Sequence, residues 1–310
     1  MEVGMMLISY LVLLIMVLIS VAFITLMEQK ILASAQIRVG PNYSGFLGLL
    51  QPFADAVKLL SKEGINTRFS SVKIYYLSPV VSLGLGLLVW VLYMFEKGGV
   101  DLMYSVLFFM CLSGLMVYPI LTSGWSSNCK YSMLGSLRAV AQMVSYEVSM
   151  AMVLLSLIWL SWSFSFYALV ESQYALWNIF LYLPLGCVWF VSSLAETNRT
   201  PYDFAEGESE LVSGFNTEYG SGGFTLIFMS EYSSMLFMGF LFSVLFLSSY
   251  ISAMIMIKSM FVVFSFVWVR GTLPRYRYDK LMGLAWKSFL PITLLMFSYY
   301  LSMSDSSIFY

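Results

Sequence analysis

Histidine is absent from this sequence of 310 residues, and its three cysteines, Cys111, Cys129 and Cys187, stand far apart. Zinc sites are built mainly from His and Cys, and an iron–sulfur cluster usually requires four thiolates. The chain alone is therefore a poor candidate for carrying a metal redox centre. The lack of histidine also excludes HExxH metalloproteases and nucleophile relays that use histidine. Any proton path must use carboxylates, lysine, tyrosine and water.

Charged residues are scarce as well, at 11% of a chain that is 60% hydrophobic. The net charge is only -1, and no basic tail or Lys/Arg-rich run indicates nucleic-acid binding. What is present instead is a series of apolar runs of about twenty residues, which soluble domains do not contain. The composition predicts an all-α integral membrane protein that forms a single polytopic domain over residues 1–310.

The apolar runs predict about eight transmembrane helices. The first is too long for the core of a signal peptide and is expected to be retained. The run over 223–269 is divided near Ser248, Ser249 and Tyr250, because it is far longer than one span requires. The expected spans are residues 3–27, 76–95, 102–121, 139–161, 175–195, 223–248, 252–269 and 284–303.

The basic residues are distributed unevenly over the loops between these spans. With eight spans, only Lys97 and Lys258 of the 16 basic residues fall on one side of the membrane, and the others fall on the opposite side. Loops rich in Lys and Arg are retained in the cytoplasm or an equivalent compartment. The pattern predicts that both termini lie opposite the basic loops.

The first loop, residues 28–75, contains the segment QPFADAVKLLSKEG, which has the period of an amphipathic helix. One face carries Phe53, Val57 and Leu60, and the other carries Asp55, Lys58 and Lys62. The plainer interpretation is a surface helix in the headgroup layer of the membrane. The sharper one is a helix that frames a mouth through which a lipid-like ligand enters from the bilayer.

A second loop, residues 196–222, concentrates acids, and charges persist near hydrocarbon mainly where they have a function. Against one base, Arg199, it carries Glu196, Asp203, Glu206, Glu208, Glu210 and Glu218. Like charges this close do not all ionise easily in a partly desolvated site, so protons can be shared. A solvated acidic loop is the alternative, but the interleaved Phe204 and Phe215 favour partial burial.

Two further acids lie inside predicted spans. Glu147 is embedded in the fourth span, which has Arg138 at its basic-side end, and Glu231 lies early in the sixth. A structural interpretation is a neutralised acid or one that is hydrogen-bonded to a neighbouring helix. A functional role is the better default for an ionisable residue within the membrane.

The stretch AETNRTPYDFAEGESELVSGFN, residues 195–216, resembles the signature of the subunit 1 family of NADH–ubiquinone oxidoreductase. These are the membrane subunits at the junction of the two arms of respiratory complex I. The likeness covers nearly the whole chain and is closest to the animal mitochondrial form. It is carried by the motifs RVGPN, LLQPFADAVKLLSKE, GWSSN, LRAVAQMVSYE, EYGSGG and RGTLPRYRYDKLMGLAWKSFLP.

The resemblance implies a role in ubiquinone reduction coupled to proton translocation. Members of the family carry no redox centre of their own. NADH, FMN and iron–sulfur clusters belong to partner subunits, and ubiquinone is the substrate. The expected partners are other membrane subunits of complex I, peripheral subunits with the terminal cluster, and lipid. The expected location is the mitochondrial inner membrane, with basic loops toward the matrix and termini toward the intermembrane space.

Family roles also map onto individual residues. The resemblance implies a carboxylate relay made of Glu147, Glu196, Asp203, Glu206, Glu208, Glu210, Glu218 and Glu231. Around the quinone chamber and its mouth it implies Arg38, Asp55, Arg138, Arg199, Phe204 and Arg275. The chain departs from the family near the first span, where Gln29 and Val39 replace basic residues and Ala33-Ser34 replaces Gly-Tyr. No role is transferred to Gln29 or Val39.

Two alternatives from other classes use the same acids. A secondary transporter or channel would bind ions with them, although no internal repeat supports this. A structural docking subunit would use the acidic loop only to hold basic surfaces of its partners.

Overall fold

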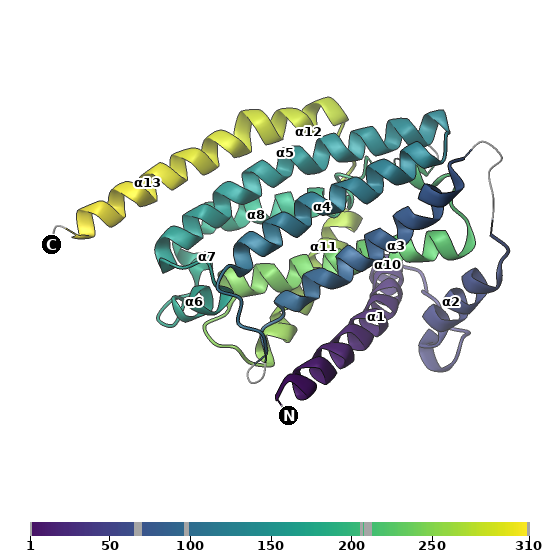
Figure 1. Cartoon of the computed structure of the whole chain (residues 1–310), viewed down its shortest axis with the longest axis horizontal. Helices are drawn as coiled ribbons and strands as arrows, with labels where there is room; N and C mark the ends of the chain where they lie inside the picture. Colours follow the sequence, from purple (N-terminus) through teal and green to yellow (C-terminus); the bar gives the residue numbers. More distant parts are fainter. Residues whose placement is uncertain (1, 65–69, 96–98, 205–206, 208–212, 309–310) are drawn as a thin grey trace.

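The computed structural model describes residues 2–64, 70–95, 99–204, 207 and 213–308, and this described part is made of helices and loops without a strand (Figure 1). The predicted all-α class is confirmed. The helices are α1 (Glu2–Ala35), α2 (Gln51–Ser61), α3 (Val72–Leu88), α4 (Ser105–Ser126), α5 (Lys130–Ser161), α6 (Phe166–Glu171), α7 (Asn178–Leu181), α8 (Leu183–Glu196), α10 (Ser221–Phe242), α11 (Met254–Thr272), α12 (Tyr278–Leu284) and α13 (Leu290–Ile308). Shorter 3-10 or π-helical turns are η1 (Phe46–Gly48), η2 (Val89–Leu92), η3 (Gly214–Asn216), η4 (Ser243–Leu247) and η5 (Ala285–Phe289).

Within the described residues, 7 helices are long and apolar enough to cross a membrane. They are Gly4–Ala35, Val72–Leu92, Ser105–Ser126, Lys130–Ser161, Ser221–Leu247, Met254–Thr272 and Tyr278–Met303. The predicted span 175–195 corresponds to the short α7 followed by α8, which has 14 residues. The long run over 223–269 is interrupted between Leu247 and Met254, so the predicted division is confirmed.

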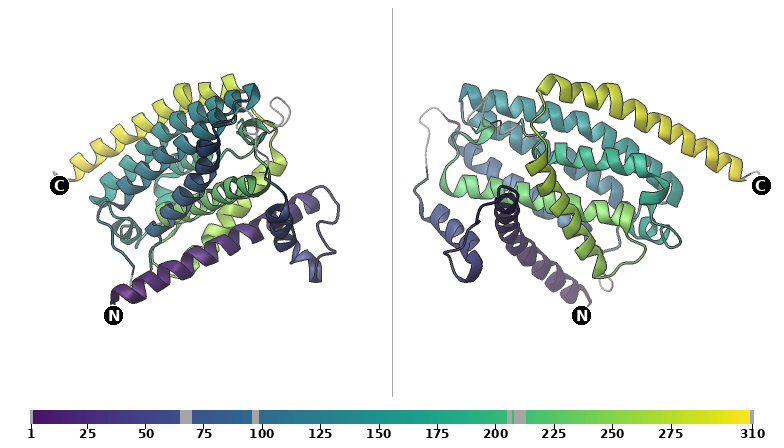
Figure 2. Two further views of the ribbon diagram at one scale, coloured as in Figure 1. Left: turned by 45° about the vertical axis from the view of Figure 1, so that its right-hand side comes forward. Right: turned by 180° about the vertical axis from the view of Figure 1, so that it is seen from behind.

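The core of the fold is centred on α10, which packs against α1, α3, α8 and α11. In the most apolar 18-residue stretch of the span Ser221–Leu247, which contains α10, 78% of the residues are buried. The corresponding share is 22% in the span Gly4–Ala35 and 17% in Tyr278–Met303. The buried side chains of Trp189, Phe237 and Phe246 fill the space around it. Helices α1 and α13 lie on the outside of the bundle (Figure 2). Their exposed apolar faces suit hydrocarbon or a partner subunit better than water.

Small residues bring the inner helices close together. A Cβ atom on Gly124 of α4 would lie 2.2 Å from Oγ of Ser136 on α5, and one on Gly239 of α10 would lie 2.6 Å from Cγ2 of Val263 on α11. Without a side chain at these positions the backbones approach closely, as is common between helices in membranes.

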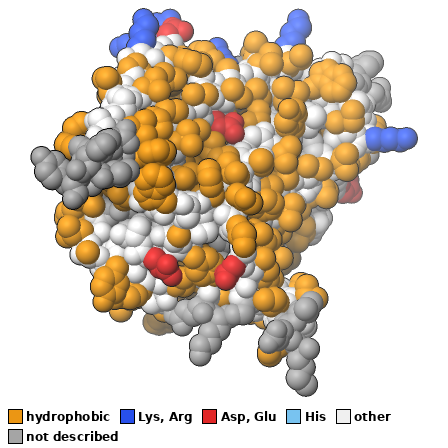
Figure 3. Space-filling view, turned by 60° about the vertical axis from the view of Figure 1, so that its left-hand side comes forward, with side chains coloured by type: hydrophobic (Ala, Val, Ile, Leu, Met, Phe, Trp, Pro, Cys, Tyr) orange, Lys and Arg blue, Asp and Glu red, His pale blue; other side chains and the backbone are white. Residues whose placement is uncertain are grey.

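The predicted amphipathic helix is present as α2, which lies beside α1 at the edge of the bundle (Figure 1). The ring of Phe53 packs edge-on against Phe23 of α1, with 5.9 Å between the centroids. The other two apolar residues of this face, Val57 and Leu60, are 67% and 66% exposed. In space-filling view, hydrophobic side chains cover most of one face of the molecule and Lys and Arg side chains stand at its margin (Figure 3). Such a surface is expected in contact with lipid.

Candidate functional site

A cavity lies between α3, α4, α5, α8 and α10, with about 840 Å³ of space that atoms do not fill, part of it open to the outside. Its lining is apolar except for a set of serines, Thr197, Asn198 and two carboxylates. The serines are Ser78, Ser82, Ser113, Ser123, Ser230 and Ser234. The carboxylates are Glu196 at the end of α8 and Glu231 in α10, both predicted relay residues.

Glu147 joins this cavity from α5. The Oγ atom of Ser113, a lining residue on α4, donates a hydrogen bond of 3.4 Å to Oε1 of Glu147. The carboxyl group also faces Gly114, where an added Cβ would lie 3.1 Å from the same oxygen. Two predicted relay acids, from α8 and α10, therefore line one cavity, and a third, from α5, lies one hydrogen bond behind its wall.

The end of α8 places Glu196 at the cavity wall. The N–H of Arg199 donates to the carbonyl of Leu194 (3.1 Å), and the N–H of Asn198 donates to that of Ala195 (3.3 Å). Asn198 has a φ of 49°, a left-handed conformation that asparagine tolerates at this position of a helix end. The turn stops the helix directly after Glu196, and Oε2 of Glu196 is buried with no hydrogen-bond partner in the described part of the chain.

Gln142 on α5 braces the loop that follows. Its buried Nε2 donates to the carbonyl of Ala195 (2.7 Å) and to that of Tyr202 (2.8 Å). One side chain thus satisfies a carbonyl on each side of the turn, where an unpaired buried carbonyl is costly. The start of the acidic loop is held against α5 by these bonds.

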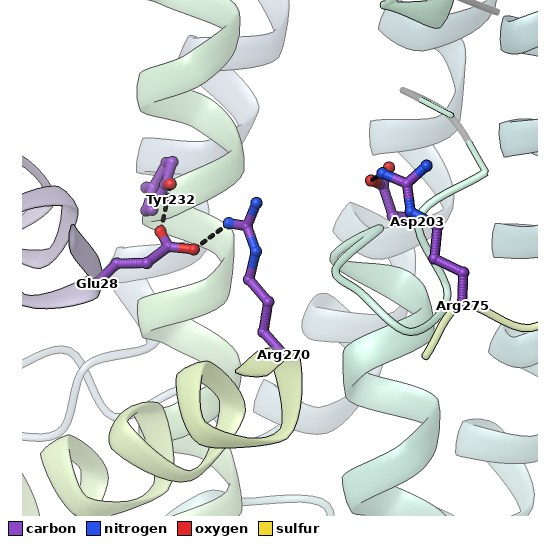
Figure 4. Close-up of polar contacts among 5 residues, drawn as sticks. All are labelled: Glu28, Asp203, Tyr232, Arg270 and Arg275. Carbon is purple, nitrogen blue, oxygen red and sulfur yellow. Dashed lines mark hydrogen bonds and ion pairs between the residues drawn. The ribbon is translucent and has the colours of Figure 1, made fainter. Parts of the chain in front are cut away.

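Asp203 and Arg275 are brought together as an ion pair, with 2.9 Å between Oδ2 and Nη2 (Figure 4). The Asp203 side chain is only 8% exposed. Beside it, Phe204 packs edge-on against Tyr278 and Tyr202 stacks on Tyr276. Burial, together with Tyr276, raises the pKa of Tyr202 to about 12.

The predicted partial burial of the acidic loop is therefore correct at its described ends, where Asp203, Phe204 and Phe215 are buried. The predicted relay acids Glu206, Glu208 and Glu210 lie outside the described residues.

Arg199 lies over the ring of Tyr232, with its Cζ atom 3.9 Å from the ring centroid. Burial opposes the charge, yet the pKa of the guanidinium is raised above its usual value, because Tyr232, Glu28 and Glu231 favour the charged form.

Sequence reasoning missed a cluster on the other side of Tyr232. The Tyr232 hydroxyl donates a hydrogen bond of 2.6 Å to Oε2 of Glu28, and Arg270 forms an ion pair with Oε1 of the same carboxylate (Figure 4). Glu28 is 5% exposed. In the sequence, each of these charged residues directly follows a predicted span. Because Glu28 and Arg270 are 242 positions apart, the sequence does not indicate that they pair.

The remaining predicted residues do not line the described cavity wall. Glu218 is half-buried near the start of α10, and Arg138 is half-buried on α5. Arg38 is exposed after α1. Asp55 accepts a hydrogen bond of 2.9 Å from Gln51 within α2. These residues occupy the loop side of the bundle around the acidic loop and α2.

Comparison with known proteins settles the family. The family described as NADH dehydrogenase matches residues 8–301. The chain belongs to this NADH dehydrogenase family. It is 56% identical over 296 residues to NADH-ubiquinone oxidoreductase chain 1 of Aedes aegypti, covering 93% of this chain and 92% of the relative.

Other relatives of the same name come from distant animals. Identity is 53% with the protein of Locusta migratoria, over 96% of this chain and 95% of the relative. It is 45% with that of Balaenoptera physalus, over 96% of both chains. The predicted membership of the subunit 1 family, and with it a place among the subunits of the complex I oxidoreductase, is confirmed.

Proposed function

We propose that this NADH dehydrogenase family subunit couples ubiquinone reduction to proton translocation through the acids at its central cavity. The observation that carries the proposal is a serine-lined space inside an otherwise apolar helix bundle, with Glu196 and Glu231 in its wall and Glu147 bonded to its lining residue Ser113. Ionisable groups inside a membrane protein are costly and mark ion or proton pathways.

The lining chemistry supports proton transfer without histidine. Carboxyl groups take up and release protons, while serine hydroxyls both donate and accept hydrogen bonds. Water would lie between the acids where serine and carboxyl groups line the space, because a buried water needs such polar partners. Protons would pass from the acidic loop to Glu196, and onward through Glu147 and Glu231 toward other membrane subunits.

The quinone chamber is proposed on the loop side of this relay. Arg199, Asp203, Phe204 and Arg275 would border it, and they are held in place by the Gln142 brace and the Asp203–Arg275 pair. The exposed apolar face of α2, with Asp55 and the nearby Arg38, would frame the entrance for a lipid-like quinone. The remaining loop acids, Glu206, Glu208, Glu210 and Glu218, and Arg138 would respond to charge changes in the chamber.

The wider setting follows from the family. The chain would lie in the mitochondrial inner membrane as a multi-pass subunit, with basic loops toward the matrix and both termini toward the intermembrane space. NADH, FMN and the iron–sulfur clusters would be held by partner subunits, and this chain would bind none of them. Reduction of quinone would change the charge in the chamber, and the relay carboxylates would respond by taking up or passing on protons, because their titrations are coupled.

Neutral substitutions test the relay. In the assembled complex, Glu196→Gln and Glu147→Gln should each lower coupled NADH:ubiquinone turnover by roughly a hundredfold. This is the lower end of the rate enhancement that a positioned proton-transfer group contributes. Glu171→Gln, at an exposed acid on α6, is the control and should keep full activity. Full quinone-dependent proton pumping in both cavity variants would refute the relay.

The alternatives give different results in the same variants. A docking subunit predicts that glutamine substitutions reduce the amount of assembled complex while the assembled enzyme keeps normal turnover. A transporter predicts ion flux through the isolated chain in liposomes that depends on Glu196 and requires no quinone.

A further inference from the structure

Lys258 is a half-buried cation on an otherwise apolar, exposed face of α11. Its neighbours on the same face, one turn before it and one turn after it, are Met254 and Phe261, which are 61% and 72% exposed. The last turn of α11 carries Arg270, which pairs with Glu28. Lys258, near the first turn, therefore lies at the opposite end of the bundle, away from the acidic loop.

The ammonium group of Lys258 is held at the break between α10 and α11. Its Nζ atom donates a hydrogen bond of 2.5 Å to the carbonyl of Leu247, the last residue of η4. It also lies 4.3 Å from the centroid of the Trp177 ring, directly before α7. These contacts place the charge at the level of the helix ends, where lysine side chains on lipid-facing helices reach the headgroup layer.

The segment that carries Trp177 is fixed by two buried amides. Gln173 donates a hydrogen bond of 2.8 Å to the carbonyl of Val244, and Asn178 donates one of 3.0 Å to that of Leu245. The two amide residues are 0% and 1% exposed, respectively. The segment is therefore tied to η4 on both sides of the tryptophan, so that the ring and the ammonium group form a preorganised pair.

The positive charge of Lys258 has no counterion in the described part of the chain. An ammonium group offers three donors, and the carbonyl of Leu247 takes one of them. Among the described residues no carboxylate forms an ion pair with Lys258. A carbonyl oxygen and the face of a ring stabilise a cation but do not neutralise its charge. At a membrane interface the abundant anion is the phosphate of a phospholipid.

The surroundings of this charge suit the acyl chains of a lipid. The Trp177 ring stacks on Phe180 of α7, with 6.2 Å between centroids and 13° between planes. Phe180 and Leu181 are 71% and 51% exposed, and Ile257 of α11 is 64% exposed. A headgroup at the ammonium would therefore leave its chains against exposed apolar side chains of α7 and α11.

We propose that Lys258 and Trp177 form a binding site for the phosphate of an anionic phospholipid at the break between α10 and α11. The ammonium group would donate to the phosphate oxygens, and the indole ring would lie at the headgroup level, which tryptophan favours. An anionic lipid is preferred to phosphatidylcholine, because the choline group already supplies a cation to its own phosphate. The bound lipid would link α7 to α11 across the end of α10. The site is separate from the carboxylate relay, so the inference does not rest on the proposed function.

Photo-crosslinking in the assembled complex tests the site. The complex is depleted of native lipid by detergent exchange and reconstituted in phosphatidylcholine vesicles with a trace of photoactivatable phosphatidylglycerol, and the labelled peptides are identified by mass spectrometry. We expect label on α7 and on the first turns of α11. Lys258→Gln should lower this label about fivefold, as for the loss of one cation near a membrane surface. Lys258→Arg keeps the charge and should keep the label. Lys130→Gln, which removes an exposed cation at the start of α5 on the loop side, is the control and should leave the label unchanged.

Photoactivatable phosphatidylcholine gives a second comparison in the parent complex, which decides the question even if Lys258→Gln does not assemble. Equal labelling of α7 and α11 by the two lipids would overturn the proposal, because a layer of unspecific boundary lipid does not distinguish headgroups. Unchanged labelling by phosphatidylglycerol in Lys258→Gln would show that the lysine only caps the carbonyl of Leu247. Absence of label from both segments of the parent complex would show that a partner subunit covers this face, and the proposal would fail.

Discussion

The Asp203 carboxylate and the Arg275 guanidinium, 2.9 Å apart, connect the loop after α8 to the segment before α12. A second bond runs beside the pair, from the N–H of Tyr276 to the carbonyl of Pro201 (3.1 Å). Two parts of the chain that are distant in sequence are therefore joined, and both contact α5, through Gln142 and Tyr146.

Removal of Arg275 should loosen this layer. Arg275→Met removes the guanidinium that pairs with the buried Asp203 carboxylate, and we expect a loss of up to about 3 kcal/mol, since the arginine is 35% exposed. Thermal inactivation of the detergent-solubilised complex should occur at a lower temperature. Arg277→Met is the matched control, because its pair with Asp279 is 78% and 72% exposed and should contribute almost nothing. Equal inactivation temperatures in the two variants would contradict this assignment.

The Gln142 brace gives a second prediction. Gln142→Met keeps the volume of the side chain but removes one hydrogen bond to each of the carbonyls of Ala195 and Tyr202, which keep the N–H of Asn198 and of Phe204 as donors, at about 0.5–1.5 kcal/mol for each lost bond. Limited proteolysis should then cut the loop after α8 more rapidly. Gln36→Met changes an exposed glutamine and should leave the rate unchanged. Unaltered proteolysis in the Gln142 variant would show that the loop is held by other contacts.

Local pattern was enough for much of the fold. The apolar runs predicted the long spans, and the turn residues near Ser248 marked the interruption between η4 and α11. The period of QPFADAVKLLSKEG predicted α2 because apolar and charged residues alternate at helical spacing. These features depend on neighbours in sequence, so no knowledge of helix packing was needed.

The site depends on packing and was predicted only in part. Charge in an apolar setting identified Glu147, Glu196 and Glu231 one at a time, but their meeting at one cavity follows from how α5, α8 and α10 lie against each other. The contacts of Glu28 with Arg270 and Tyr232 join three helices, and no local spacing encodes them.

Helix contacts at glycine give a third prediction. Gly124→Ala would place a Cβ atom 2.2 Å from Oγ of Ser136 and 2.9 Å from the backbone oxygen of Ser132, so α4 and α5 must move apart. We expect a loss of about 1–3 kcal/mol, as for overpacking elsewhere, and less assembled complex. Gly84→Ala has no atom within 4 Å of the added Cβ and should be neutral or stabilising by up to about 1 kcal/mol. Normal assembly of the Gly124 variant would mean that the helices separate at little cost.

The ion pair between Glu28 and Arg270 gives the last prediction. Glu28 is 6% exposed in its side chain and Arg270 is 37% exposed, so the pair is only partly screened by solvent. Glu28→Gln keeps an oxygen that can accept from Tyr232 but removes the charge that faces Arg270, whereas Arg270→Gln removes the other charge. The two substitutions should not be additive, and the double variant should be more stable than the sum of the single losses by about 0.5–3 kcal/mol. Thermal inactivation of the three variants and the parent complex measures this coupling. Strictly additive losses would mean that the contact between α1 and α11 contributes nothing beyond the packing of the two side chains.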